Sequence, residues 1–360
     1  MRNFGSTLLK ILVTLIAVLA VAFIVLLIVI SVKEYKPEDW EQLEVASCAS
    51  PEEVILPGDN LKILTWNVGC GTLGDNADFF MDYGKMVYTA DVQRVGENIG
   101  GIIDSLDDIQ PDIMLLQETD INSSRSYGVN ERELISTAFP AYDNTFAYNF
   151  NVAYIPYPIP PIGRVESGLT TLSRYPISSA ERIQLPCPFK WPVRCLNLKR
   201  CLSVSRIPVE GTDKQLVIVN LHLEAYDDGV GKAAQTRMLA DFLQTEAAAG
   251  NYVIAGGDFN QRFSYTDASA YPEYEGKWHC GILDEVEFGQ HLDFCQDPSF
   301  PTCRSLDKPL VGADRDTFQY YVIDGFIVSD NIEVISVETI DNQFKYTDHN
   351  PVVLEVSLKP

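Results

Sequence analysis

The sequence predicts an α/β domain, a sandwich of two mixed β-sheets with helices outside, preceded by one N-terminal transmembrane helix. Three observations support this prediction. A long apolar run lies near the N-terminus, and two later segments have the helical spacing of apolar residues. Short β-rich runs alternate with these helices in some places and follow one another in antiparallel-looking pairs in others. This mixture favours two packed sheets over one doubly wound sheet.

The apolar run covers residues 11–32, where Thr14 and Ser31 are the only polar side chains. As a helix it would span roughly 33 Å, about the hydrocarbon thickness of a bilayer. A cleaved signal peptide is the alternative, but its apolar region is usually only about 7–15 residues long. The lipoprotein-like sequence at residues 45–48 lies too far beyond the run for that type of processing. We therefore expect residues 1–32 to form an uncleaved membrane anchor.

The charges on either side of the run predict its orientation. Before the run, Arg2 and Lys10 have no acidic neighbour. After it, Lys33 and Lys36 are outnumbered by the acidic residues Glu34, Glu38, Asp39, Glu41 and Glu44. Because basic residues concentrate on the inner side of a membrane, we expect the N-terminus inside and the remaining chain outside the cell membrane.

Residues 33–60 are polar and contain three prolines, so we expect a linker that leads to a single domain over residues 61–360. Helices are predicted in this domain at residues 91–109, which end before Pro111, and at residues 231–248. Strands are predicted at residues 61–66, 113–116, 170–172, 196–204, 216–221, 251–255, 321–328, 332–337 and 351–358.

The formal net charge of −23 restricts the partners of this chain. Such a charge disfavours long-range attraction to nucleic-acid backbones or anionic lipid surfaces without bound cations. A metal site could still neutralise a phosphate group locally. The eight cysteines lack zinc-type spacing, but in an extracellular domain disulfides could form within the groups 187/195 and 280/295/303. No protein partner is predicted.

Polar side chains cluster where several of the predicted strands end or begin. The clusters at strand ends are TWN (65–67), LLQE (115–118), VNLH (219–222) and GGDFN (256–260), and TDHNP (347–351) opens the last strand. A sixth cluster, VID (322–324), places an acid inside an otherwise apolar strand. Strand ends belong to a rigid scaffold and can hold functional side chains in fixed geometry. Six such clusters in one chain indicate a functional site.

The residue types in these clusters indicate a reaction. Carboxylates supply the hard oxygen ligands that Mg²⁺ or Mn²⁺ takes, and amides can orient a water or a phosphoryl oxygen. Imidazoles can transfer protons near neutral pH. Because no serine or cysteine nucleophile accompanies them, the set points to metal-assisted attack of water on phosphorus. The residues concerned are Asn67, Glu118, His222, Asp258, Asn260, Asp324, Asp348 and His349.

Most of these residues also have a structural explanation when each is taken alone. Glu118 could end a strand in solvent, Asp258 could cap a turn, and His222 could be a hydrogen-bonded core histidine. Asp324 is harder to explain in this way because an unpaired buried carboxylate is costly. His279 and the other remaining histidine, His291, have no such sequence context and are assigned to the surface or to a structural role.

The ordered set of clusters resembles the endonuclease/exonuclease/phosphatase superfamily, which includes pancreatic deoxyribonuclease, abasic-site endonucleases, inositol polyphosphate 5-phosphatases and neutral sphingomyelinases. The matching blocks are TWNV (65–68), LLQETD (115–120), SGLTTLSRYPI (167–177), NLHLEA (220–225), GGDFN (256–260), VIDGFIVS (322–329) and TDHNPV (347–352). They follow the family's order. The resemblance implies a four-layer α/β/β/α sandwich with the site at one end of the two sheets.

The resemblance also implies a role for each residue. Glu118 resembles the principal metal ligand, with Asn67 beside it and Asp348 near the metal. His222 resembles the histidine that protonates the leaving oxygen in the nuclease and sphingomyelinase branches. A further group would hold the attacking water and the phosphoryl oxygen (Asp258 and Asn260) or contact the phosphate (His349, oriented by Asp324).

Two points stay open after the resemblance is taken into account. The general base could be Asp258 or the pair formed by Asp324 and His349. The tyrosine of the abasic-site endonucleases has no clear counterpart, which disfavours that branch.

The expected function is that of a membrane-anchored, Mg²⁺-dependent or Mn²⁺-dependent phosphodiesterase that acts on a lipid head group, as sphingomyelinases do. The anchor and the acidic composition favour a lipid. Residues 154–162, rich in proline and apolar side chains, could form a rim that rests on lipid, or simply a stiff loop. The alternatives are an extracellular endonuclease that cleaves DNA or RNA, and a catalytically inactive binding protein with the same fold.

Overall fold

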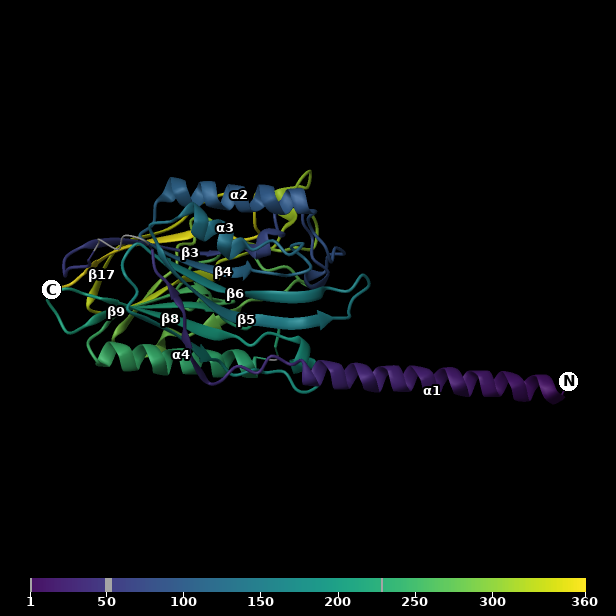
Figure 1. Ribbon diagram of the computed structural model, residues 1–360. Coiled ribbons are helices and arrows are strands. Elements are labelled where there is room, and N and C mark those ends of the chain that lie inside the picture. Colours follow the sequence, from purple (N-terminus) through teal and green to yellow (C-terminus); the bar gives the residue numbers. More distant parts are fainter. Residues whose placement is uncertain (1, 49–53, 228) are drawn as a thin grey trace.

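The structure, a computed structural model, describes residues 2–48, 54–227 and 229–360 (Figure 1). Two seven-stranded β-sheets pack face to face, and helices cover the outer face of each sheet. The predicted four-layer α/β/β/α sandwich is therefore confirmed. One long helix projects from the body of the molecule at its N-terminus. Residues 49–53 of the expected linker lie outside the described ranges.

The helices are α1 (Arg2–Val32), α2 (Val92–Ile109), α3 (Glu131–Ala138) and α4 (Val230–Ala248). Short 3₁₀ helices are η1 (Gly69–Gly71), η2 (Phe80–Asp82), η3 (Val193–Leu196), η4 (Glu285–Phe288) and η5 (Arg315–Thr317). The two helices predicted in the domain are α2 and α4. Helix α2 begins after Asp91, whose side chain accepts a hydrogen bond from the backbone N–H of Arg94, as an N-cap should.

The first sheet has the strand order β1-β7-β8-β9-β10-β16-β13. Its strands are β1 (Trp40–Leu43), β7 (Ser179–Gln184), β8 (Cys201–Pro208), β9 (Gln215–His222), β10 (Tyr252–Asp258), β16 (Asp324–Ser329) and β13 (Leu292–Cys295). Helix α4 covers its outer face, where Leu239 and Leu243 join the apolar cluster of that layer.

The second sheet has the order β17-β18-β3-β4-β6-β5-β2. Its strands are β17 (Ile332–Thr339), β18 (Val352–Leu358), β3 (Asn60–Asn67), β4 (Ile113–Asp120), β6 (Gly163–Ser173), β5 (Asp143–Ile155) and β2 (Val45–Ala46). Helices α2 and α3 cover its outer face. Two small pairs lie apart from the main sheets: β11 (Gln261–Phe263) with β12 (Gly281–Leu283), and β14 (Cys303–Arg304) with β15 (Tyr320–Tyr321).

The inner faces of the two sheets share the main hydrophobic core. Ile63 and Leu115 of one sheet pack in the same cluster as Ile218 and Ile254 of the other, and all four are fully buried. Close packing of this kind fixes the two sheets relative to each other. The ends of their strands therefore form a rigid platform.

Residues 40–46, expected to belong to the linker, contribute a strand to each sheet. Strand β1 pairs with β7 at an edge of the first sheet, and β2 pairs with β5 at an edge of the second. Leu43 and Val45 pack against the core between the sheets, which explains why this polar segment is ordered there. Two apolar side chains among charged neighbours are too weak a pattern to predict a strand.

Helix α1 contains one apolar segment, Ser6–Val32, long enough to cross a membrane. Only 6% of its most apolar window is buried, whereas a core helix of a soluble protein would be mostly covered. The C-terminal end of α1 rests on η3, while the rest extends away from the body (Figure 1). All eight cysteines lie in the described ranges and are free, so the disulfide groupings considered from the sequence are not formed.

Candidate active site

The strand registers bring three of the sequence-predicted residues side by side. Asp258, the last residue of β10, is the register partner of His222 on parallel strand β9. Asp258 is also the register partner of Asp324 on antiparallel strand β16. Asn67 ends β3 in the other sheet, beside β4, which carries Glu118. Four strand ends from two sheets thus meet at one end of the sandwich.

Glu118 is turned into the site by an irregularity in β4. The pairing of β4 with β6 shifts register between Leu116 and Thr119, and Glu118 has a φ of 55°. A left-handed φ is unfavourable for a residue with a side chain and persists only where the surroundings enforce it. The bulge therefore directs the carboxylate of Glu118 away from the regular alternation of the strand.

A buried polar bridge between the sheets supports the floor of the site. The Gln117 Nε2 atom donates to Asn220 Oδ1 at 2.9 Å across the interface. Asn220 Nδ2 lies 3.2 Å from the carbonyl oxygen of Leu116 and 3.1 Å from that of Thr170. Both amides are fully buried. Glu118 directly follows Gln117 in sequence, and His222 lies two residues after Asn220. The hydrogen bond between the two amides therefore fixes the spacing between the two halves of the site.

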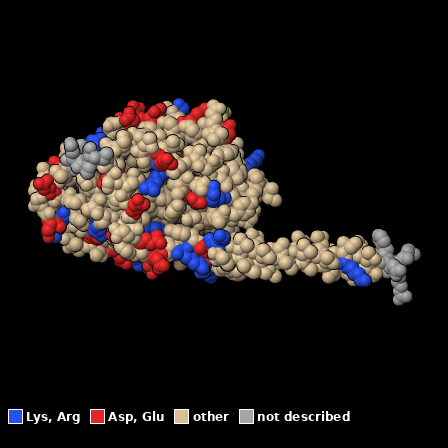
Figure 2. Space-filling model, in the orientation of Figure 1, with Lys and Arg blue, Asp and Glu red and all other residues tan. Residues whose placement is uncertain are grey.

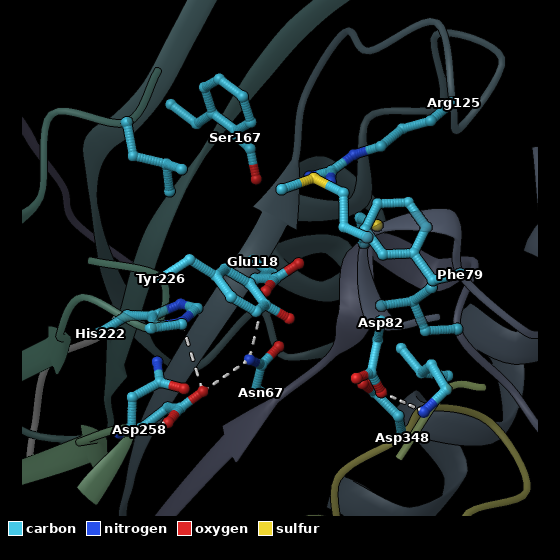
Figure 3. A pocket seen from close by; sticks show the side chains of 18 of the residues that line it. Asn67, Phe79, Asp82, Glu118, Arg125, Ser167, His222, Tyr226, Asp258 and Asp348 are labelled. Atoms are coloured by element: carbon cyan, nitrogen blue, oxygen red, sulfur yellow. Dashed lines mark hydrogen bonds and ion pairs between the residues drawn. The ribbon is translucent and has the colours of Figure 1, made fainter. Parts of the chain in front are cut away.

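Asn67 connects the acidic residues of the site (Figure 3). Its Nδ2 atom donates to Asp258 Oδ2 at 3.2 Å and to Glu118 Oε1 at 3.4 Å, while its Oδ1 accepts from the N–H of Gly69 at 3.0 Å. His222 Nε2 lies 3.3 Å from the same Asp258 Oδ2. These contacts join four of the predicted residues in one network.

His349 and Asp324 form a buried pair behind this network. The Nδ1 atom of His349 lies 2.9 Å from Asp324 Oδ2, and its Nε2 atom lies 3.8 Å from Asp258 Oδ2. Burial alone would lower the pKa of His349, but the Asp324 carboxylate, together with Cys303, raises that pKa well above its ordinary value. His349 is therefore positioned as a cation between two carboxylates.

The two other titratable groups shift in opposite directions. Burial, assisted by the charge of Asp324, raises the pKa of Asp258 to about 7. Burial, together with the positive charges of Arg200 and His349, lowers the pKa of His222 well below its ordinary value. An anionic substrate beside His222 would raise that pKa again because it stabilises the imidazolium form. The site thus contains a carboxyl group and an imidazole suited to exchange protons.

Asp348 lies in a second part of the site, beside Asp82 (Figure 3). Burial raises the pKa of both carboxyl groups, that of Asp82 to about 6. Thr347 Oγ1 donates to the backbone carbonyl of Asn67 at 3.0 Å and lies 3.2 Å from Asp348 Oδ1, which connects this part to the first. Asn260 is held by hydrogen bonds from its N–H to Asp258 Oδ1 and from its Nδ2 to the backbone, both at 2.9 Å.

The donor set fits a hard divalent cation. Among the described residues, the carboxylate of Glu118 accepts only the 3.4 Å hydrogen bond from Asn67, which leaves lone pairs available. The negative charge of Glu118 also contributes to the raised pKa of Asp348, so a cation placed near both would relieve their repulsion. Asp348 also lies close enough to Cys303 and His349 to share an ion with them, as does Asp258 with Asp324 and His349. Carboxylate oxygens are the ligands that Mg²⁺ and Mn²⁺ prefer.

Seven of the eight predicted site residues line the floor of a pocket of about 630 Å³. The eighth, Asp324, lies behind His349 and does not line the pocket. The walls above the floor are largely apolar. They come from three segments: the loop around η2, the β5–β6 hairpin, and the segment that contains η3. The wall residues are Phe79, Phe80, Met81, Val87, Phe150, Ile155, Tyr157, Ile162, Phe189, Leu196 and Leu198.

Two further pocket residues were not predicted from the sequence. Arg200 is only 5% exposed, and its Nε and Nη1 atoms have no hydrogen-bond partner among the described residues. Its nearest acidic partner, Glu224, lies 3.9 Å away. Tyr226 points into the pocket, and burial raises the pKa of its hydroxyl (Figure 3). Only the proximity of Tyr226 to the NLHLEA block could have drawn attention to it, and nothing in the sequence singles out Arg200.

Several solved structures have a fold similar to that of this chain. None of the curated protein sequences matches this chain. Among solved structures, the endonuclease/exonuclease/phosphatase from Beutenbergia cavernae is 15% identical, with a TM-score of 0.55 over 83% of this chain and 72% of that one. The human Nocturnin catalytic domain is 16% identical, with a TM-score of 0.51 over 88% of this chain and 98% of that one.

A third similar structure, D. rerio TDP2 complexed with a single-strand DNA product, is 15% identical, with a TM-score of 0.52 over 83% of this chain and 99% of that one. At these identities the likeness concerns the fold alone. The profile of the Endonuclease/Exonuclease/phosphatase family matches residues 64–349, most of the chain. The chain therefore belongs to the endonuclease/exonuclease/phosphatase family.

Proposed function

We propose that this protein is a membrane-anchored, divalent-metal-dependent phosphodiesterase that hydrolyses a phosphodiester in a lipid head group. Family members are hydrolases of phosphoester bonds and generally use divalent metal ions. The observation that carries the lipid assignment is the shape of the pocket, whose acidic and imidazole floor lies beneath largely apolar walls. Such walls suit the apolar part of a lipid better than the charged backbone of a nucleic acid.

In this proposal Glu118, Asn67 and Asp348 would hold Mg²⁺ or Mn²⁺, which when bound would offset negative charge on the phosphoryl group. Asp258, whose pKa is raised to about 7, accepts the proton of the attacking water, since a base with a pKa near the working pH is the most efficient. Asn260 beside it orients the water or a phosphoryl oxygen.

The positive groups act on the phosphate and on the leaving oxygen. His349, kept charged by Asp324, donates a hydrogen bond to a phosphoryl oxygen. His222 takes up a proton when the anionic substrate binds and passes it to the leaving oxygen. Arg200, whose buried Nε and Nη1 atoms lack a hydrogen-bond partner within the described part of the chain, binds a further oxygen of the phosphate. The eight residues predicted from the sequence and Arg200 thus each have a place in one reaction.

The same proposal assigns residues 1–32 to an uncleaved anchor, residues 33–60 to the connection and residues 61–360 to the catalytic domain. The flanking charges support an orientation with the N-terminus inside and the catalytic domain outside the cell. Strands β1 and β2 within the connection pair with the sheets, so the connection is in part an element of the domain.

The test is turnover by the full chain in Mg²⁺-containing phosphatidylcholine and sphingomyelin vesicles, with plasmid DNA and RNA as competing substrates. A truncation that removes residues 1–44 is unsuitable because it would delete β1 (Trp40–Leu43). We expect release of a phosphorylated head group that EDTA and Asp258→Ala both abolish. Asp213→Ala, at an exposed aspartate, is the matched control and should remain active.

Two other outcomes would replace the proposal. Cleavage of DNA or RNA with intact lipid would identify an extracellular nuclease. Absence of turnover on every substrate, with retained metal binding, would favour an inactive binding protein. On the face drawn in Figure 2, acidic and basic side chains are interspersed over the domain without a continuous basic stripe, which supports the lipid over the nucleic acid.

A further inference from the structure

The catalytic pocket and helix α1 lie at the same end of the molecule. Strand β4 ends with Asp120 paired to Ser167 of β6, close to Glu118. From that level the β5–β6 hairpin continues to its turn at residues 156–162, beyond the carboxylates. Figure 1 shows this hairpin projecting toward the side from which α1 extends, its tip reaching past the C-terminal end of α1.

The end of α1 is fixed to the wall of the pocket by specific contacts. Ser31 Oγ accepts a hydrogen bond from Trp191 Nε1 at 2.9 Å. The side chain of Glu34, only 4% exposed, lies 3.2 Å from Arg194 Nε and 3.6 Å from Lys199 Nζ. Because residues of the same segment, Leu196 among them, line the pocket, the direction of α1 is coupled to the direction in which the pocket opens.

A second contact connects α1 to the hairpin itself. Tyr35, directly after the helix, packs edge-on against Tyr148 of β5, with ring centroids 6.1 Å apart. The guanidinium of Arg182 lies over the Tyr35 ring at 5.9 Å. These contacts fix the orientation of α1 relative to the β5–β6 hairpin. A bilayer that surrounds α1 would therefore contact the hairpin tip in one defined orientation.

The hairpin tip and η3 expose apolar side chains where this bilayer would begin. Ile159 is 94% exposed and Tyr157 71%, while Trp191 and Val193 are each more than half exposed. We call these four residues the docking rim. Large apolar and aromatic side chains gathered around a pocket mouth are costly to leave in water, and tryptophan and tyrosine are typical of the membrane interface. The basic group of Lys190 lies next to Trp191 in sequence, suited to a phosphate head group.

We propose that the docking rim inserts into the same leaflet in which α1 ends, so that the pocket opens onto lipid rather than onto water. The rim is a bilayer-binding surface distinct from the catalytic residues. Ile159 does not line the pocket among the described residues, whereas Tyr157 lines it and joins the rim to the wall through Phe80, at 6.3 Å between ring centroids. A lipid would reach the floor by moving between these walls with its chains still in the bilayer. This last step rests on the proposed hydrolase function, whereas the insertion of the rim rests only on the proposed membrane anchor.

Insertion is tested with the full chain in vesicles that contain brominated lipid, which quenches tryptophan emission within the bilayer. Ile159→Trp should add emission that the bromine quenches. Ile335→Trp is the matched control, because Ile335 is a half-exposed isoleucine on β17, which lies toward the opposite end of the molecule (Figure 1). Emission added at position 335 should not be quenched. Equal, weak quenching at both positions would overturn the proposal.

Activity provides a second readout. Ile159→Asp should lower turnover of vesicle lipid by about tenfold. This is the factor expected when the free energy of transferring an isoleucine side chain from water into the bilayer is lost. Its turnover of a water-soluble phosphodiester, bis(p-nitrophenyl) phosphate, should be unchanged, and Ile335→Asp should change neither. An equal loss on both substrates would assign Ile159 to folding and would contradict the proposal. Quenching of Ile159→Trp without any lipid turnover by the wild type would refute the lipid-hydrolase function while leaving the docking surface established.

Discussion

Replacement of Arg200 by methionine separates the binding of an anionic substrate from the stability of the fold. The guanidinium is 5% exposed, two of its N–H-bearing atoms lack partners among the described residues, and Glu224 lies 3.9 Å away. A buried donor without a partner costs about 1–3 kcal/mol, and a charge-assisted hydrogen bond contributes about 1.5–3 kcal/mol. The free protein therefore bears a cost that a phosphoryl oxygen would offset when it binds.

Methionine keeps the length of the side chain and removes its charge. We expect kcat/KM for the phosphodiester to fall roughly 10- to 100-fold, the kinetic equivalent of that lost hydrogen bond. The free energy of unfolding should change by less than about 1 kcal/mol, because the weaker pairing of Glu224 opposes the relief of the buried donors. Arg237→Met, at an exposed arginine on α4, is the control.

Kinetics on vesicle lipid and on the soluble phosphodiester, together with denaturant unfolding, measure both quantities. A kcat/KM that stays near the wild-type value would refute the role of Arg200 in substrate binding. A loss of activity accompanied by an equivalent loss of stability would refute it as well, since a structural role would then be sufficient.

Three further predictions follow from other parts of the molecule. Mg²⁺ should raise the thermal midpoint of the wild type but not that of Glu118→Gln, in a calorimetric titration; an equal rise would place the metal elsewhere. Asn220→Leu should cost about 2–4 kcal/mol in denaturant unfolding because the carbonyl groups of Leu116 and Thr170 lose their side-chain donor and Gln117 loses one acceptor, and a cost below about 1 kcal/mol would contradict the bridging role. Burial would raise the pKa of Glu246, but Arg206 at 2.6 Å and Asn251 lower it overall. The stability contributed by this group is thus present above its ordinary pKa and is lost as the pH falls through its lowered value; Glu246→Gln should be less stable by about 1 kcal/mol or less at pH 7, and the difference should vanish in acid.

The sequence was sufficient to predict the layers of the fold and the residues that meet at the site. Asp258 and His222 could be predicted because each ends a strand, and strand ends meet where sheets pack. Asp324 was expected inside a strand at residues 321–328, where an unpaired carboxylate is costly, whereas in the structure it is the first residue of β16. The direction of Glu118 could not be predicted, since it depends on a bulge that appears only when β4 pairs with β6. Arg200 could not be predicted either. Its proposed role depends on buried Nε and Nη1 atoms that lack hydrogen-bond partners among the described residues, and only the three-dimensional structure reveals this.

The two short strands formed by residues 40–46 could not be predicted from the sequence either. This short segment, which contains two glutamates, is ordered because it pairs with β7 and β5 at the edges of the two sheets. The 13-residue strand β5, which has asparagines and two alanines among its aromatic residues, likewise owes its length to pairing with β6 rather than to intrinsic β propensity. The roles assigned to the individual site residues stay predictions.

The pairing of β1 has a consequence for where the protein can work. Only residues 33–39 separate the end of α1 from the start of β1, and even fully stretched such a segment covers no more than about 25 Å. A connection of this length keeps the domain next to the membrane that holds α1, out of reach of a neighbouring cell or a distant vesicle. With α1 in a bilayer, hydrolysis is confined to lipids of that membrane. Its rate then depends on how fast these lipids diffuse laterally within the bilayer to the opening of the pocket.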